Sequence, residues 1–267
     1  MIYVNGDSHS AGAEIIENYA YAKDDRKYLA YGRRAHPEAV LQTYGYRLSQ
    51  AMNQGFFCEA ESGSSNDRII RTTRNFIENT DNKKNIHIVI GWSTWEREEW
   101  QLTDTEYLQV TSSGTDSVPE SMEEEYKEWV VAQTEKELDR KTALWHKRIY
   151  DFHMELRDQN IKHTFFNTYL EFDNIAVPVP DRREWHNQFI NPYDQDYTFF
   201  YYLKNKGIDT VNENSYHYGI NGHREWTKVV LENYLSQYRI KSSPNYNRTK
   251  FPMLQKVQPM VDKKRNF

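Results

Sequence analysis

Short apolar runs that end in small polar residues recur along the chain, and they define its predicted architecture. The clearest run spans residues 85–91, where four of the five positions 86–90 are apolar and Gly91 follows. Such dense apolar character predicts a strand buried on both faces, as in the centre of a parallel sheet. Three further runs predict strands at about residues 2–4, 55–60 and 162–168.

Between these runs, apolar residues recur at the spacing of an α-helix. This pattern predicts helices at about residues 38–53, 66–77, 196–206 and 222–238, and one long or two consecutive helices over 121–158. Strands that alternate with helices predict an α/β fold of three layers, α/β/α, with a flavodoxin-like parallel sheet. The turns after the strands are then expected to gather along one edge of the sheet.

The length of the chain predicts one domain with additions. At 267 residues it is long enough to bury a large core. We expect an α/β domain over 1–238, with helical or loop insertions at about 96–145 and 171–200. Within the first insertion, residues 96–118 are polar and are predicted to form a loop or small excursion. The tail, 239–267, carries eight basic residues and one acid, although the whole chain has a net charge of -5.

The composition limits the expected cellular compartment and the classes of binding partner. The single cysteine, Cys58, excludes an internal disulfide framework, and no apolar run is long enough to span a membrane. We therefore expect a soluble, cytoplasmic protein without a signal peptide or a membrane partner. The basic tail is expected to be extended or docked on the acidic body, and it is the one segment where contact with nucleic acid stays open. No P-loop, CxxC or HExxH spacing occurs, so no cofactor or metal is predicted.

The candidate chemistry lies in the turns after the predicted strands. Gly6-Asp7-Ser8 follows the first strand, Ser62-Gly63-Ser64 follows the second, and Gly91-Trp92-Ser93 follows the third. Near the end of the chain, His217 is followed by Gly222-His223. A parallel sheet would bring a serine hydroxyl, free amide groups and an imidazole to one edge. These are the groups that nucleophilic acyl transfer requires.

Taken together, these short blocks resemble the signature of the SGNH hydrolases, the GDSL-like esterases and acyl hydrolases. The stretches Gly63–Arg68 and Gly91–Ser93 are similar to those of SGNH-like proteins of tailed phages. The resemblance implies a serine hydrolase acting on an ester, either acyl or O-acetyl and on a carbohydrate in some cases. It implies Ser8 as the nucleophile and His217 as the general base.

The remaining site residues also follow from the resemblance. It implies that the amides of Ser8 and Gly63 hold the oxyanion with help from Ser93, which stands where the family has an asparagine. Asn214 stands where the family has the aspartate that orients the histidine, and Glu213, Asp209 or a backbone carbonyl are alternatives to it. A small-molecule or glycan ester is the expected partner, bound by these residues: Asp7, His9, Asn66, Trp92 and Trp185.

Two other functions stay open from the sequence. The changes at Ser93 and Asn214, with 20 tyrosines and seven tryptophans that could stack on sugar rings, suit an SGNH-like module that binds a glycan, an acyl group or a protein without turnover. Asp7-Ser8-His9 also resembles the opening Asp-x-His of metal-dependent phosphoesterases. Such an enzyme would need further ligands, for which Asp67, His217 and His223 are available.

Overall fold

The computed structural model of the chain describes residues 1–16, 33–112, 118–173 and 182–239. Four parallel strands form the central sheet in the order β2-β1-β3-β6. Their bounds are Phe56–Cys58 for β2, Ile2–Asn5 for β1, His87–Trp92 for β3 and Lys162–Asn167 for β6. The α/β class and the flavodoxin-like order of the sheet are confirmed, because the first strand lies between the second and the third.

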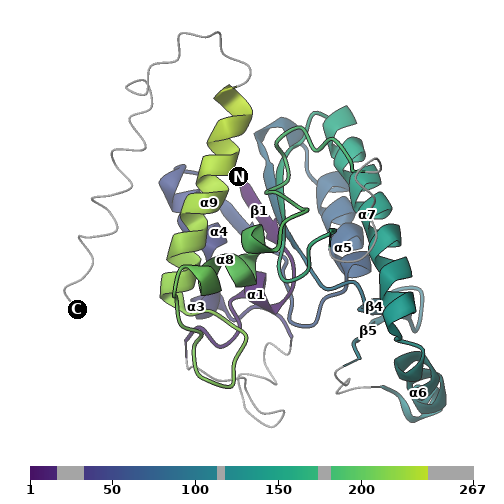
Figure 1. Cartoon of the computed structure of the whole chain (residues 1–267). Coiled ribbons are helices and arrows are strands. Elements are labelled where there is room, and N and C mark those ends of the chain that lie inside the picture. Colours follow the sequence, from purple (N-terminus) through teal and green to yellow (C-terminus); the bar gives the residue numbers. More distant parts are fainter. Residues whose placement is uncertain (17–32, 113–117, 174–181, 240–267) are drawn as a thin grey trace.

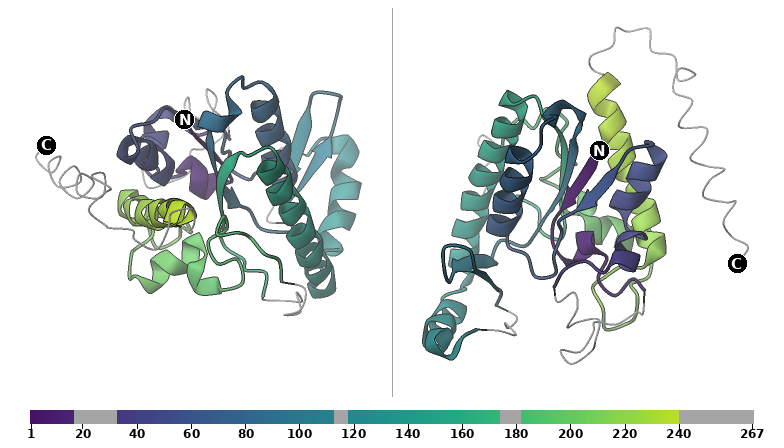
Figure 2. Two further views of the ribbon diagram at one scale, coloured as in Figure 1. Left: turned by 90° about the horizontal axis from the view of Figure 1, so that it is seen from above. Right: turned by 180° about the vertical axis from the view of Figure 1, so that it is seen from behind.

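Helices cover both faces of this sheet (Figures 1 and 2). One layer consists of α5 (Asn66–Glu78) and α7 (Glu135–Asp158), and the opposite layer contains α4 (Tyr44–Ala51), α8 (Phe199–Asn205) and α9 (Ile220–Arg239). The alternation of side chains along β1 explains the two cores. Tyr3 packs into the core beneath α5 and α7, whereas Ile2 and Val4 pack into the core beneath α4 and α9.

The predicted helix at 38–53 is instead two helices, α3 (Pro37–Val40) and α4. Thr43 separates them, because its backbone is extended and its hydroxyl accepts a hydrogen bond from the Tyr46 amide. A threonine in that conformation caps the start of a new helix rather than continuing the old one. The predicted helical region at 121–158 is also two helices, α6 (Glu123–Val131) and α7, with Thr134 as the second cap.

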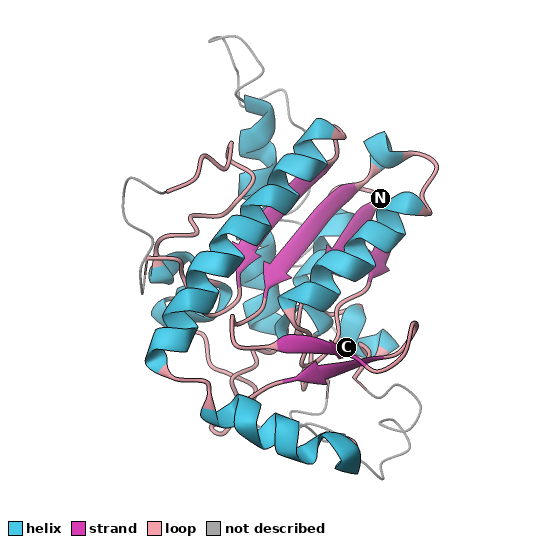
Figure 3. Ribbon diagram, turned by 90° about the vertical axis from the view of Figure 1, so that its right-hand side faces the viewer, coloured by secondary structure: helices cyan, strands magenta, loops and turns pink. Residues whose placement is uncertain are grey.

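The segment predicted as a polar loop, 96–118, contains a β-hairpin that the sequence pattern missed. Strands β4 (Glu98–Gln101) and β5 (Tyr107–Val110) pair only with each other, in antiparallel fashion. Figure 3 shows this hairpin apart from the central sheet, between α5 and α6. Its strands are short and carry several polar side chains, so they lack the apolar runs of the central strands.

The second predicted insertion packs on the body of the protein. Its residues 174–181 and the basic tail from 240 onward lie outside the described residues. In the described part, Phe189 is bridged to β6 and Trp185 packs beside α7. No helix among the described residues has the length and apolar character to cross a membrane.

Three histidines form a continuous hydrogen-bonded chain that begins on β6, passes through α7 and ends in the loop that contains His186. His163 Nδ1 donates to the carbonyl oxygen of Ile161 (3.0 Å), so its Nε2 accepts a hydrogen bond from His153 Nδ1 (2.8 Å). His153 Nε2 then accepts from His186 Nδ1 (3.2 Å). Each ring is therefore neutral, with its tautomer fixed by its neighbour. Arg157 closes the chain by donating to His186 Nε2 (2.6 Å).

We expect the free energy of unfolding to fall as the pH drops from 6.5 toward 5. Burial lowers the pKa of four histidines to about 3, whereas the unfolded chain binds these protons near pH 6.5. Protonation therefore favours the unfolded state, by up to about 1.4 kcal/mol per pH unit for each histidine. The four residues are His87, His153, His163 and His223.

Urea unfolding at pH 7 and pH 5 measures this dependence, in a range where most carboxylates stay ionised. His163→Gln should reduce the slope with pH, whereas His186→Gln, which changes an exposed histidine, should largely keep it. Equal unfolding free energies at the two pH values would contradict the prediction.

Candidate active site

Ser8 lies at the start of the short helix α1 (Ser8–Ala11), directly after β1. The Asp7 carboxylate caps this helix by accepting a hydrogen bond from the His9 amide (3.1 Å). Gly6 is required before it, because its φ is 151° and a Cβ there would lie 2.4 Å from Ser10 Oγ and 2.8 Å from the Gly91 carbonyl oxygen. Ser8 is thus held at the carboxyl edge of the sheet, and its side chain is partly exposed.

The structure brings Ser8 and His217 together from opposite ends of the chain. Ser8 Oγ lies 2.9 Å from His217 Nε2, which is hydrogen-bonding distance. The other ring nitrogen, Nδ1, lies 3.1 Å from Oε2 of Glu14. A carboxylate only accepts, so Nδ1 carries the proton and the lone pair of Nε2 faces the serine hydroxyl.

Glu14, not Asn214, is the partner of His217. Asn214 is exposed, and its backbone N–H donates to the side-chain oxygen of Asn212 (2.9 Å). Ser215 strengthens the alternative arrangement: its hydroxyl bonds to Glu14 and accepts a hydrogen bond from the His217 amide (2.9 Å). The prediction that Asn214 orients the histidine is therefore wrong.

The backbone of Glu14 adopts an uncommon conformation for a residue with a side chain. Its φ is 63°, in the left-handed region that costs about 1 kcal/mol for a residue other than glycine. The hydrogen bond from His217 lowers the pKa of Glu14, so the carboxylate stays ionised at neutral pH. Glu14 therefore combines an unfavourable backbone conformation with a negative charge. The sequence alone did not identify it, because no motif spacing links residue 14 to residue 217.

The Ser93 hydroxyl is already engaged. It is buried, donates to Oδ2 of Asp7 (3.3 Å) and accepts from Nη1 of Arg97 (2.9 Å). A hydroxyl has one proton, so none is left for an oxyanion. The structure therefore contradicts the expected donor role of Ser93. Asp7 is only 2% exposed and both of its oxygens are occupied, which contradicts its expected contact with a substrate.

The turn that carries Gly63 lies beside Gly6, because the Glu61 amide donates to the Gly6 carbonyl oxygen (3.2 Å). No described residue accepts a hydrogen bond from the Gly63 amide, and the same holds for the Ser8 amide. With respect to the described residues, both amides are therefore free to donate to an oxyanion.

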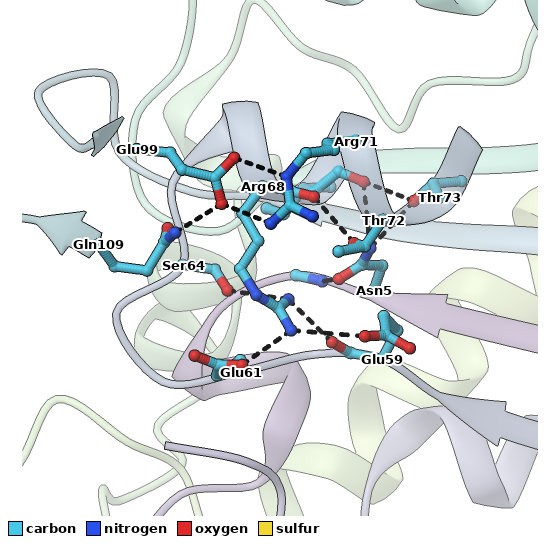
Figure 4. A network of polar contacts seen from close by, with 12 residues as sticks. Asn5, Glu59, Glu61, Ser64, Arg68, Arg71, Thr72, Thr73, Glu99 and Gln109 are labelled. Atoms are coloured by element: carbon cyan, nitrogen blue, oxygen red, sulfur yellow. Dashed lines mark hydrogen bonds and ion pairs between the residues drawn. The ribbon is translucent and has the colours of Figure 1, made fainter. Parts of the chain in front are cut away.

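Figure 4 shows how this turn is supported from two sides. Arg68 of α5 pairs with Glu61 at 2.8 Å and with Glu59 at 3.4 Å. On the other side, Gln109 of β5 accepts a hydrogen bond from the Ser65 amide (2.9 Å). Gln109 in turn donates to Glu99 (2.7 Å), which also pairs with Arg71 of α5. The hairpin β4–β5 therefore braces the turn against the sheet.

Three further residues predicted to bind substrate are structural. The Asn66 side chain accepts from the Ser93 amide (2.8 Å) and donates to the Ser93 carbonyl (3.0 Å), and it is fully buried. Trp92 is fully buried in the core beneath α5 and α7. Trp185 is 5% exposed and donates to Tyr193. None of the three can touch a substrate in this arrangement.

The remaining histidines near the site have different surroundings. His9 stays partly exposed, with its ring centroid 4.9 Å from that of His217, so its expected contact with a substrate remains a prediction. His223 is buried and accepts a hydrogen bond from the Tyr44 amide (3.2 Å), which caps α4.

The residues available to a metal ion do not converge. Asp67 pairs with Arg148 at 2.6 Å, while His217 and His223 have the separate partners given above. In the part of the chain that the structure describes, no group of three or more histidine, cysteine or acidic side chains is arranged to hold a metal ion.

A pocket of about 610 Å³ flanks the His217 loop on the side of Glu14. Ile15, next to Glu14, and Gly219, two residues after His217, are part of its wall. Ser8 is not among the lining residues, so this pocket adjoins the candidate site without containing the nucleophile.

No protein-family model and no curated protein matches this sequence. Among solved structures, the chain is similar to that of a carbohydrate esterase whose active site is described as having "divergent catalytic and non-catalytic binding functions". The TM-score is 0.44 at 16% identity, over 88% of this chain and 64% of that one, so the chain spans about two thirds of its length at most. A similarity at this level carries no information about the residues that act or their substrate.

We expect Asn66→Ala to lower the free energy of unfolding by about 2–3 kcal/mol, because it leaves the Ser93 amide and carbonyl groups buried without partners. Asn75→Ala is the matched control, since Asn75 lies exposed on the same helix. Urea unfolding at pH 7 measures both values. If Asn66→Ala lowered the free energy of unfolding by no more than the control does, the hydrogen bonds between Asn66 and Ser93 would not contribute to stability.

Proposed function

We propose that this chain is a serine hydrolase that cleaves carboxylic esters, with Ser8, His217 and Glu14 as its catalytic triad. One observation carries the proposal, namely two consecutive hydrogen bonds. The first joins Ser8 Oγ to His217 Nε2 (2.9 Å), and the second joins His217 Nδ1 to Glu14 Oε2 (3.1 Å). A nucleophile within reach of a base, itself oriented by a carboxylate, is the arrangement that activates a serine.

In the first half of the reaction, His217 Nε2 takes the proton of Ser8 while Oγ attacks the carbonyl carbon of the ester. The amides of Ser8 and Gly63 donate hydrogen bonds to the oxygen that becomes negative. The tetrahedral intermediate then collapses, its bond to the alcohol breaks, and His217 returns its proton to the leaving oxygen. The acyl group remains on Ser8.

In the second half, His217 removes a proton from water, and the resulting hydroxide attacks the acyl carbon. The intermediate collapses by breaking the bond to Ser8 Oγ, which regains a proton from His217. Glu14 stays ionised throughout and stabilises the imidazolium that forms in both halves. The ionised state agrees with the lowered pKa of Glu14.

The proposed substrates are acyl or O-acetyl esters, with esters on carbohydrates as one class to screen. We expect His9 to contact the group bound to the nucleophile, because its ring centroid lies 4.9 Å from that of His217. The amino-acid sequence supports the same class through the resemblance of its blocks to SGNH hydrolases.

A fluorophosphonate probe should label Ser8 and no other serine. The probe reacts with a serine whose proton is taken by a neighbouring base, which is the state that His217 provides. Mass spectrometry of the labelled peptide locates the adduct, and Ser8→Ala should abolish it. Folded protein that shows no adduct, and no turnover of p-nitrophenyl acetate, would instead favour a binding module without catalysis.

Glu14→Gln should lower kcat for p-nitrophenyl acetate by about 10³–10⁴-fold, because an amide neither stabilises the imidazolium nor fixes the required tautomer. Asn214→Ala should leave kcat unchanged, since Asn214 is exposed and away from Nδ1. The two variants therefore separate the two residues as partners of His217. The reverse result, with Asn214→Ala inactive and Glu14→Gln active, would refute the triad.

A further inference from the structure

The site contains one strong hydrogen-bond donor that the proposed mechanism does not yet use, the guanidinium group of Arg97. It stands where the sequence led us to expect a donor from Ser93, because its Nη1 lies 2.9 Å from the Ser93 hydroxyl. It also lies 3.5 Å from Oδ2 of Asp7, the residue directly before Ser8. The cation is thus placed against the start of the nucleophile's helix.

Arg97 is poorly paired in comparison with Arg71 of α5. Its nearest carboxylate oxygens lie at 3.5 Å on Asp7 and 3.8 Å on Glu96, too far for a good hydrogen bond. By contrast, Arg71 makes two bonds of 2.7 and 2.8 Å to Glu99.

Within the described part of the chain, two of the three nitrogens of Arg97 have no hydrogen-bond acceptor. Nε is buried with no hydrogen-bond partner, and no described residue accepts a hydrogen bond from Nη2. A guanidinium has five donors and no acceptor, so an incomplete set of partners leaves it able to bind an anion. The side chain is 20% exposed, which leaves it accessible from the edge of the sheet.

The Asp7 carboxylate does not cancel this capacity. It is buried, its Oδ1 accepts from the His9 amide and its Oδ2 accepts from Ser93. It therefore fixes the position of the cation through Ser93, while it leaves most of the guanidinium donors free. Such a positioned and incompletely paired cation is what stabilises a charge that develops during a reaction.

We propose that Arg97 is the side-chain donor of the oxyanion hole, acting beside the amides of Ser8 and Gly63. This inference rests on the proposed esterase function and concerns the same site. Arg97 donates a hydrogen bond and transfers no proton. It binds the substrate's carbonyl oxygen weakly while that oxygen is neutral, and strongly when the attack of Ser8 makes it an anion. The effect therefore falls on kcat more than on KM.

The test compares Arg97→Gln and Arg97→Lys with the unchanged chain, using neutral p-nitrophenyl acetate and phenylboronic acid. The boronic acid forms a tetrahedral, negatively charged adduct with a serine oxygen, so its affinity reports on the oxyanion hole. For Arg97→Gln we expect kcat about 100-fold lower, KM little changed and boronate affinity reduced by a similar factor. Arg97→Lys, which keeps the charge, should lose less on both counts.

Arg74→Gln is the matched control, because Arg74 of α5 forms a solvent-exposed pair with Glu155 of α7 and, among the described residues, makes no hydrogen bond or ion pair with Asp7, Ser93 or Ser8. It should leave kcat and boronate affinity unchanged. A double variant, Asp7→Asn with Arg97→Gln, addresses a structural role by removing both charges together. We expect it to regain the thermal stability that Arg97→Gln loses, but not its turnover.

Three results would overturn the inference: unchanged boronate affinity in Arg97→Gln, a loss confined to KM, or wild-type turnover in the double variant. The last would show that Arg97 only neutralises Asp7. Failure of the esterase proposal is a separate outcome, because it appears as a lack of turnover and of boronate binding in the unchanged chain.

Discussion

The close approach of β1 and β3 at their carboxyl ends is the constraint on which the site depends. Gly6 and Gly91 face each other there, and the Ser10 hydroxyl fits between them: a Cβ on either glycine would lie within 2.8 Å of Ser10 Oγ. Tyr44 then donates to that same oxygen at 2.9 Å, which ties α4 to the junction. A side chain at either glycine would push the strands apart and move Ser8 with them.

Hydrogen bonds and ion pairs on both sides of this junction hold the residues of the site in place. Toward β2, Glu61 binds Gly6, and the network around Arg68 holds the Gly63 turn. Toward β3, the Asn66 side chain bonds to both backbone groups of Ser93. The polar residues that the sequence suggested as substrate contacts are mostly used in this way. Their hydrogen bonds hold the turns that carry the free amides and the hydroxyl of Ser8.

The sequence was sufficient for the sheet, because its strands are dense apolar runs and their order follows from the rules of parallel α/β folds. It also predicted that Ser8 and His217 lie at one edge, because Ser8 belongs to Gly6-Asp7-Ser8 after the first strand and His217 precedes Gly222-His223 at a defined spacing. Glu14 and Arg97 could not be found in this way. They lie in polar stretches without periodicity, and their roles depend on the path of the backbone, such as the left-handed turn at Glu14.

Ser8 and Glu14 belong to one short stretch at the amino terminus, whereas His217 comes from the loop between α8 and α9, where the Val211 amide donates to the His217 carbonyl oxygen. Two of the three proposed triad residues are therefore close in sequence, and the third comes from the carboxyl-terminal part of the chain. A local opening of that loop would withdraw the imidazole and leave the serine and the carboxylate where they are. In such an opening the serine would lose its base while the core of the sheet stayed intact.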